Sequence, residues 1–378
     1  MNIKKRLKKF AHLIFYILWT FPVKRNRILF SSFQGKGYGD NMKPIADKLL
    51  EDDEIEIIWL VSKHYDDMPS KIKQVNTKGL KRLYYIATSK VWLNNERFSS
   101  YIRKRKNQVY FQTWHSSLRL KKIEADAADS LPDSYIEAAK NDSDMINYIL
   151  CGCEFSKKTY SESFWYNGPV LMCGTPRLDK FFDKNECGRI RSELKEKFGI
   201  NGKKIILYAP TFRNADSEFT GTLDFNRFAG EYLPEDEYVI LVRMHPLSKA
   251  EFDTAPNVIN VTDYPNMQDL LILCDFLVTD YSGCCFDTLV QKKPCIMYIP
   301  DLDDYLAKDR NLYFTFDELP FEKAVTPDEL KEIITKFDKE AYEEKVDSFT
   351  KEIGFAETGK ASEYVSNMIK EIVHNEKV

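Results

Sequence analysis

A chain of 378 residues exceeds one typical hydrophobic core and predicts two domains of about 150–200 residues each. With 43% hydrophobic and 13% aromatic side chains, the composition indicates a packed globular protein and excludes intrinsic disorder. The formal net charge is −3 and the basic residues concentrate at one end of an acidic chain, which excludes the footprint of a nucleic-acid-binding protein.

The chain starts with a basic, partly apolar segment. Its first 27 residues carry eight basic side chains and no acidic one, so the rest of the chain holds 47 basic and 58 acidic side chains. An apolar run from 10 to 23 is shorter than the roughly 20 residues that span a bilayer, and no small-residue cleavage site follows it. We expect residues 1–26 to form an amphipathic helix on the anionic cytoplasmic membrane surface; a helix docked on the protein's own core or on a partner is the alternative.

Residues 27–175 alternate between short apolar runs and helical patterns, as in a doubly wound parallel sheet. Helices are expected near 41–50, 79–87 and 130–140. The glycine-rich loop 34–40 lacks the GxGxxG order of a dinucleotide site, so we interpret it as a loop on the acceptor side. The expected strands are 27–32, 56–61, 91–94, 109–113, 149–152 and 170–173.

A second set of strands and helices follows in residues 176–360, and residues 361–378 read as a helical tail. The helix 267–273 lies between strands, and Thr326 begins a further helical region. The sequence therefore predicts an α/β protein of two Rossmann-like domains with a cleft between them. The expected strands of this set are 203–208, 238–243, 258–261, 275–279 and 295–299.

The segment 275–287 predicts a phosphate site. An apolar strand ends at Thr279-Asp280-Tyr-Ser282-Gly283, and a helical pattern starts directly after it. Unpaired backbone N–H groups and the positive end of the helix dipole then point at one spot. An ordinary helix cap is the alternative for Thr279, Ser282 and Gly283. Asp287 lies one turn into the helix, where its carboxylate can accept ribose hydroxyls.

His115 follows a predicted strand, at the edge of the sheet where α/β proteins bind ligands. Histidine is well suited to take a proton from a hydroxyl near neutral pH, although a single histidine is more often structural. Arg119, Lys121 and Lys122 follow and offer positive charge to anionic groups.

Two further strand ends carry cations. Arg243-Met-His245-Pro246 ends one strand, and Arg213 follows another. An imidazole or imidazolium at His245 can neutralise a leaving phosphate, while Pro246 fixes the turn. Because these ends and the Ser282 loop converge on one side of the second sheet, their combination is a stronger signal than any one motif.

Metal and redox chemistry find little support in the sequence. The eight cysteines lack zinc-ligand spacing and read as buried thiols. The spacing of Asp275, Asp280 and Asp287 matches no dedicated divalent site. We expect neither a metal nor another cofactor.

Taken together, these segments resemble the CDP-glycerol glycerophosphotransferase family of teichoic acid primases and polymerases, over residues 27–360. Trp114-His115 followed by Leu118 and Lys121 resembles the family's Trp-His-Gly-Thr-Pro-x-Lys segment. The other matching segments are Ala209-Pro-Thr-Phe-Arg213, Arg243-Met-His-Pro246, Thr279-Asp-Tyr-Ser282, Asp287 with Lys293-Pro294, and Asp301-Leu-Asp-Asp-Tyr305.

The resemblance implies a GT-B fold, a peripheral place on the cytoplasmic membrane, and transfer of glycerol phosphate or a related polyol phosphate from a CDP-alditol to a hydroxyl, releasing CMP. It implies that His115 is the general base and that His245 stabilises the diphosphate. The implied donor-binding residues are Arg213, Arg243, Pro246, Thr279, Asp280, Ser282, Gly283 and Asp287. We place Trp114, Ser116, Arg119 and Lys121 on the acceptor or phosphate side.

The chain departs from the family pattern at Ser116-Ser117-Leu118-Arg119, where Gly-Thr-Pro is usual. The acceptor is therefore open, and a wall teichoic acid, a capsule glycan or a polyprenyl-linked acceptor all fit. A GT-B glycosyltransferase that uses a nucleotide sugar is the alternative enzyme. A non-catalytic member of a glycan assembly complex is the alternative from another class.

Overall fold

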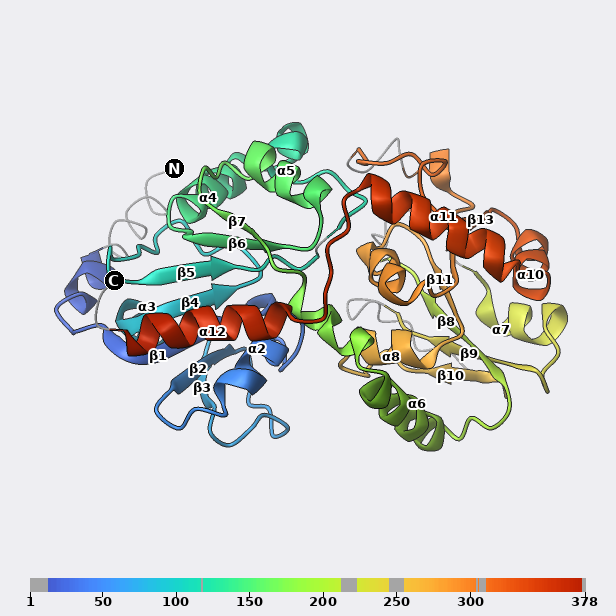
Figure 1. Ribbon diagram of the computed structural model, residues 1–378, viewed down its shortest axis with the longest axis horizontal. Coiled ribbons are helices and arrows are strands. Elements are labelled where there is room, and N and C mark those ends of the chain that lie inside the picture. Colours follow the sequence, from blue (N-terminus) through green and yellow to red (C-terminus); the bar gives the residue numbers. More distant parts are fainter. Residues whose placement is uncertain are drawn as a thin grey trace. The chain divides into compact units, whose positions relative to one another are not determined.

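The computed structural model describes residues 13–116, 118–211, 223–244, 255–303, 305 and 311–375. The chain divides into two compact units, each an α/β layer structure around a parallel sheet (Figure 1). The first unit comprises Met1–Ser117, Ile123–Asp179 and Ala356–Val378. The second unit comprises Leu118–Lys122 and Lys180–Phe355.

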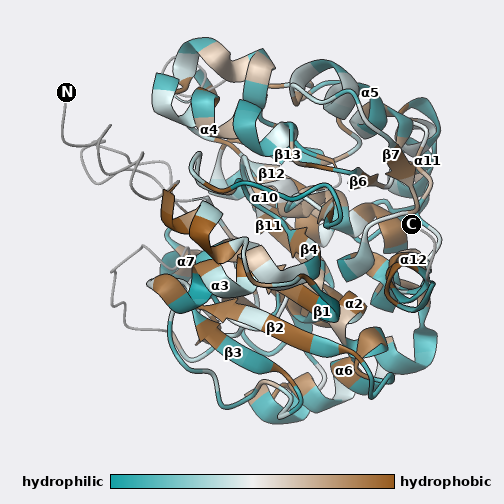
Figure 2. Ribbon diagram, turned by 90° about the vertical axis from the view of Figure 1, so that its left-hand side faces the viewer, coloured by the Kyte–Doolittle hydropathy of each residue, from teal (hydrophilic) through white to brown (hydrophobic). Residues whose placement is uncertain are grey.

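The first unit contains a seven-stranded parallel sheet in the order β3-β2-β1-β4-β5-β6-β7. Each central strand contains a buried apolar run, at 28–30 in β1, 57–61 in β2 and 91–93 in β4, and Figure 2 shows these strands largely in brown. Helices on both faces cause this pattern. The strands are β1 Lys24–Ser31, β2 Glu56–Val61, β3 Lys73–Asn76, β4 Ser89–Asn94, β5 Val109–Gln112, β6 Tyr148–Cys151 and β7 Val170–Met172.

Helices of the first unit come from both ends of the chain. The last helix, α12, packs on α2, and its Val365 and Ile369 share a core with Met42 and Ile45. The α-helices are α2 Met42–Leu49, α3 Leu80–Thr88, α4 Asp133–Ser143, α5 Glu154–Ser163 and α12 Ala361–His374. Short 3₁₀ segments are η1 Phe33–Gly35, η2 Glu124–Ser130 and η3 Pro176–Phe182, the last of which continues into the second unit.

The second unit contains a six-stranded parallel sheet in the order β10-β9-β8-β11-β12-β13. Because all strands run in one direction, the loops after β8, β9, β11 and β12 leave the same edge of the sheet. The strands are β8 Lys204–Ala209, β9 Tyr238–Val242, β10 Val258–Asn260, β11 Phe276–Thr279, β12 Cys295–Tyr298 and β13 Glu322–Ala324. The helical segments are α6 Lys184–Phe198, α7 Phe225–Arg227, η4 Phe228–Tyr232, α8 Met267–Leu273, η5 Gly283–Gln291, α10 Pro327–Thr335 and α11 Lys339–Glu352.

The expected central strands are confirmed, with ends shifted by at most three residues. Two edge strands, β3 and β13, were not expected. The chain passes from the first to the second unit after Asp179, four residues beyond the predicted boundary after Thr175. Residues 361–374, predicted as a helical tail, form a helix of the first unit. Residues 118–122 belong to the second unit, although the sequence analysis placed them in the first domain.

The N-terminal segment 1–26, which was predicted to lie on the membrane surface, is described only from residue 13 onward, and its membrane contact stays a prediction. Residues 1–12 lie outside the described residues, and residues 13–18 are helical. Phe15 is fully buried, and the Arg105 guanidinium donates to the carbonyls of Leu18 and Phe21 at 3.3 and 2.8 Å. Part of the segment thus docks on the first unit, because it carries an apolar face of its own. No helix among the described residues is long and apolar enough to cross a membrane.

Candidate functional site

His115 lies in the loop after β5 and is exposed. Its Nδ1 is 3.3 Å from the carbonyl oxygen of Asn95, at the end of the neighbouring strand β4. Since a carbonyl can only accept, this contact places the proton on Nδ1 and leaves Nε2 as the basic nitrogen. A neutral imidazole in this tautomer can accept a proton at Nε2, and the catalytic role of His115 stays a prediction.

A polar network holds the backbone of this loop. The Arg177 guanidinium donates to the His115 carbonyl and, at 3.0 Å, to the Asp40 carboxylate. Asp40 also accepts from Asn95 Nδ2 at 2.7 Å, and Asn41 Nδ2 donates to the Trp114 carbonyl at 3.0 Å. The side chains of Asp40 and Arg177 are 8% and 9% exposed, and Asn95 is fully buried. Their hydrogen bonds are therefore shielded from water.

Strained backbone gathers at the same loops. Positive φ angles of 41°, 55°, 55° and 49° occur at Phe33, Gln34, Asp40 and Trp114, none of which is glycine. Such angles are unfavourable for L-residues and persist where surrounding contacts enforce them. Their concentration around His115 supports a functional site.

Beside His115 lies a cavity of about 370 Å³ that is lined by residues of the first unit. The Trp114 indole N–H is buried there and has no hydrogen-bond partner among the described residues. Burial raises the pKa of the Glu96 carboxyl, against the opposing effect of hydrogen bonds from Gln34. The Glu96 carboxyl and His115 thus line a space that can hold a polar ligand. The lining residues are Gln34, Glu96, Arg97, Phe98, Ser99, Trp114, His115, Tyr135 and Ala138.

A buried ion cluster supports the cavity. Arg97 contacts Glu124 at 3.0 Å and Asp142 at 3.1 Å, and all three side chains are almost fully buried. Its guanidinium lies 3.8 Å from the ring centre of Phe164 and 5.7 Å from that of Trp114. The cluster therefore positions the wall that carries the indole.

The other residues assigned to the acceptor side belong to different units. Ser116 is buried in the first unit, where its carbonyl accepts from Tyr160 Oη at 3.0 Å. Arg119 and Lys121 belong to the second unit, where Arg119 is buried and the Lys121 ammonium lies 5.0 Å from the ring centre of Tyr305. Their proposed contact with a substrate stays a prediction.

In the second unit, Thr279 and Asp280 stabilise the end of β11. Thr279 Oγ1 donates to the Ala209 carbonyl at 2.6 Å, and the Asp280 carboxylate accepts from the Thr211 N–H at 2.8 Å. Both side chains are buried. They tie the ends of β8 and β11 together, which sets the position of the loop that follows.

The Ser282 side chain caps η5, where it accepts from the Cys284 N–H at 3.5 Å, and Gly283 starts this 3₁₀ segment. Asp287 is buried and accepts from Gln268 Nε2 at 2.9 Å. This contact ties Asp287 to α8. The prediction that Asp287 binds a ribose is untested, as are the roles of Ser282 and Gly283.

Arg243 follows β9 at the same edge of the sheet, and its N–H donates to the Tyr208 carbonyl at 2.9 Å. Its Nη1 is buried and lacks a hydrogen-bond partner among the described residues. Burial lowers the pKa of this guanidinium. An uncompensated buried cation is suited to bind an anionic group of a ligand. Arg213, His245 and Pro246 lie outside the described residues.

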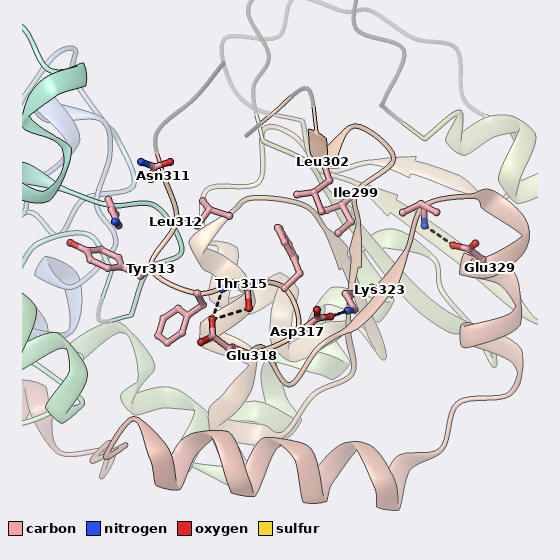
Figure 3. Close-up of a pocket in the computed structure, with 14 residues that line it drawn as sticks. Ile299, Leu302, Asn311, Leu312, Tyr313, Thr315, Asp317, Glu318, Lys323 and Glu329 are labelled. Carbon is pink, nitrogen blue, oxygen red and sulfur yellow. Dashed lines mark hydrogen bonds and ion pairs between the residues drawn. The ribbon is translucent and has the colours of Figure 1, made fainter. Parts of the chain in front are cut away.

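A second cavity, of about 710 Å³, lies in the second unit (Figure 3). Its acids already have partners: Asp317 pairs with Lys323, Glu318 accepts from Thr315, and Glu329 accepts from the Val325 N–H at 2.8 Å. Its lining residues are Lys122, Ile299, Leu302, Asn311, Leu312, Tyr313, Phe314, Thr315, Phe316, Asp317, Glu318, Lys323, Val325 and Glu329.

Sequence reasoning missed several residues of the first-unit site. Asp40 ends the glycine-rich loop 34–40, and Arg177 lies just after the predicted domain boundary. Asn95 and Glu96 carried no signal, because their roles depend on the parallel pairing of β4 with β5. Among the described residues, no group of three or more histidine, cysteine or acidic side chains is arranged to hold a metal ion.

Comparisons with known proteins agree with the geometry. Residues 13–371 match the model of the family described as CDP-Glycerol:Poly(glycerophosphate) glycerophosphotransferase. A teichoic acid poly(glycerol phosphate) polymerase of Bacillus spizizenii is 29% identical over 97% of both chains. A teichoic acid glycerol-phosphate transferase of Staphylococcus aureus is 33% identical over 84% of this chain and 85% of its own. The solved wall teichoic acid polymerase TagF superposes with a TM-score of 0.85 at 25% identity, covering 99% of this chain and 98% of its own.

Proposed function

Because the chain belongs to the CDP-glycerol:poly(glycerophosphate) glycerophosphotransferase family, we propose that it transfers glycerol phosphate from CDP-glycerol to a hydroxyl of a teichoic acid acceptor. The observation that carries this proposal furthest is His115, whose Nδ1 contact with Asn95 leaves Nε2 as the basic nitrogen. Glycerol is favoured over ribitol because both relatives compared above are named for glycerol phosphate.

In this mechanism, Nε2 of His115 takes the proton of the acceptor hydroxyl. The acceptor oxygen forms a bond to the β-phosphorus of the donor, and the bond from that phosphorus to the bridging oxygen breaks. The electron pair of this bond stays with the departing CMP. The cavity beside His115, which Glu96 and Trp114 also line, is the proposed place for the acceptor.

The second unit holds the donor in this proposal. The Arg243 guanidinium, which lacks a partner at Nη1 among the described residues, binds a phosphate of the CDP group. The N–H groups at the start of η5, after Ser282, add partial positive charge. We further propose a GT-B arrangement, a role for His245 beside the diphosphate, and neutralisation by side chains without a divalent metal. Activity in a chelator would test the last point.

A peripheral location on the membrane is part of the proposal. The side chains of Leu13, Tyr16, Ile17 and Phe21 are between 46% and 57% exposed, although they are large and apolar. Figure 2 shows a short apolar helix next to the grey N-terminal trace. Lys24 and Arg25 follow directly and can contact anionic lipid headgroups.

The decisive experiment measures CMP release from CDP-glycerol and from CDP-ribitol with candidate acceptors. His115→Ala should reduce transfer about 10²–10⁴-fold, as expected for loss of a general base. The matched control is His64→Ala, since His64 is an exposed histidine of the same unit that pairs with the exposed Asp66 at 3.3 Å. Transfer that is unchanged in His115→Ala, or that requires a nucleotide sugar instead of a CDP-alditol, would contradict the proposal.

A further inference from the structure

Residues 118–122, which we call the strap, begin three positions after His115 and belong to the second unit. Leu118 and Leu120 are 4% and 1% exposed, so they anchor the strap by burial. The strap also pairs in antiparallel fashion with residues 311–313: Lys122 N–H donates to the Asn311 carbonyl and Tyr313 N–H to the Leu120 carbonyl, both at 2.8 Å. This segment is therefore fastened to the second unit along its length.

The strap is also connected to the proposed phosphate loop through two stacked tyrosines. The rings of Tyr281 and Tyr305 lie 3.4 Å apart at an angle of 6°, and the Lys121 ammonium lies 5.0 Å from the Tyr305 ring centre. Tyr281 directly precedes Ser282, and its hydroxyl donates to the Asp301 carboxylate at 3.0 Å. Both tyrosines are buried, which fixes the stack in one arrangement.

The chain around His115 is held on the other side as well. The carbonyls of His115 and Ser116 accept hydrogen bonds from Arg177 and from Tyr160, which belong to the first unit. Only residue 117 lies between these anchors and the strap. The stack and four residues of chain therefore connect the loop that carries Ser282 to the backbone next to His115.

We propose that Tyr281, Tyr305 and Lys121 are positioning residues, which couple the donor-phosphate loop to the placement of the His115 base. This inference rests on the proposed function, in which His115 is the base and the Ser282 loop contacts the donor. None of the three residues needs to touch the reacting atoms. A base displaced by about 1 Å loses a large part of its effect, so the stack controls turnover rather than donor affinity.

The test is a double-mutant cycle on glycerol phosphate transfer, with donor affinity measured by calorimetry. Tyr305→Leu should lower kcat about tenfold or more and leave the Kd for CDP-glycerol within about twofold. Tyr305→Phe keeps the ring and should restore most of kcat. In the His115→Ala background, Tyr305→Leu should have no further effect, because it acts only through the base.

Lys121→Met provides a second variant. It removes the cation from a partly exposed site and leaves no cavity in the core. It should lower kcat in the same direction as Tyr305→Leu, again only when His115 is present. An equal loss in both backgrounds, an equal loss in Tyr305→Phe, or no loss in Lys121→Met and Tyr305→Leu would overturn the coupling. If His115→Ala itself leaves kcat unchanged, the assignment of the base fails and this inference fails with it.

Discussion

Arg243 carries a buried guanidinium nitrogen that no described residue neutralises. We expect Arg243→Gln to weaken binding of CDP-glycerol about tenfold or more, since a charge-assisted hydrogen bond to phosphate is lost. The ligand-free protein should become more stable by roughly 1 kcal/mol, because a desolvated charge is removed. Calorimetry and thermal unfolding without ligand measure the two effects.

The control for Arg243 is Arg189→Gln, an exposed arginine of the same unit that pairs with Glu186 and Glu193. It should change neither quantity by much, since water and salt screen an exposed ion pair. If Arg243→Gln destabilises the free protein, the guanidinium has a structural role and the anion site lies elsewhere.

We expect the free energy of unfolding to depend on pH through the carboxyl of Asp142. Burial raises the pKa of its carboxyl to about 6, against the lowering effect of Arg97. A folded-state pKa above the unfolded value means that the native state binds the extra proton, so this contribution to stability is present at low pH and is lost as the pH rises from about 4 to 6. The free energy of unfolding of the wild type, minus that of Asp142→Asn, should fall over this window by an amount on the order of 2 kcal/mol. Denaturant titrations at several pH values measure it, and a constant difference would contradict the shift.

Individual residues of the site were predictable where a histidine or an arginine stood at the end of a predicted strand. His115 and Arg243 were predicted in this way, because each follows an apolar run. Asp40 and Arg177 were not, since their ion pair at 3.0 Å joins positions 137 residues apart. Such a partnership depends on tertiary packing and leaves no local pattern.

At the level of elements, burial decided which strands could be predicted. Strands β2 and β11 are almost entirely apolar and were predicted at nearly the observed bounds. The edge strands β3, with the sequence KQVN, and β13, with EKA, contain one fully buried residue each. An edge strand needs polar residues to remain soluble, so its sequence resembles that of a loop.

Helix α12 returns from the C-terminal end of the chain to complete the first unit. Ile369 is fully buried in the core with α2, so Ile369→Ala should destabilise the first unit by about 2–5 kcal/mol. All five tryptophans, at positions 19, 59, 92, 114 and 165, lie in this unit, so their fluorescence reports its unfolding alone. The denaturant midpoint seen by fluorescence should therefore fall.

The matched control for Ile369 is Tyr364→Ala on the same helix, because Tyr364 is 48% exposed. It should leave the fluorescence midpoint almost unchanged. An Ile369→Ala variant with the wild-type midpoint would show that α12 contributes little to the stability of the first unit.

For the whole molecule, composition and alternation indicated two α/β domains but did not reveal how the chain is divided. The sequence suggested one boundary, whereas the units exchange segments at 117/118, 122/123, 179/180 and 355/356. The exchange of residues 118–122 depends on burial of Leu118 and Leu120 and on pairing with residues 311–313, which are distant in sequence. Hydrophobic periodicity is a local property and does not contain this information.

The N-terminal segment shows how structure sharpens a prediction about the molecule as a whole. Deletion of residues 1–24 is the test that the sequence suggests, but it would remove the buried Phe15 and the first residue of β1. We therefore expect the combined change Leu13→Ser, Tyr16→Ser and Ile17→Ser to keep the fold and to weaken sedimentation with anionic liposomes. Each large apolar side chain buried in lipid contributes about 1.5–3 kcal/mol, so the loss in partitioning should be tenfold or more.

Two comparisons make this test of membrane association specific. Phe182→Ser with Tyr364→Ser changes side chains that are also exposed, at 44% and 48%, but lie elsewhere on the chain, so liposome binding should persist. Phe15→Ala should lower thermal stability instead, because Phe15 is fully buried. If the triple variant sediments like the wild type at physiological salt, the exposed apolar face is not the membrane contact. Basic charge or another surface then carries the attachment, and raising the salt concentration separates the two, since only the electrostatic part is screened.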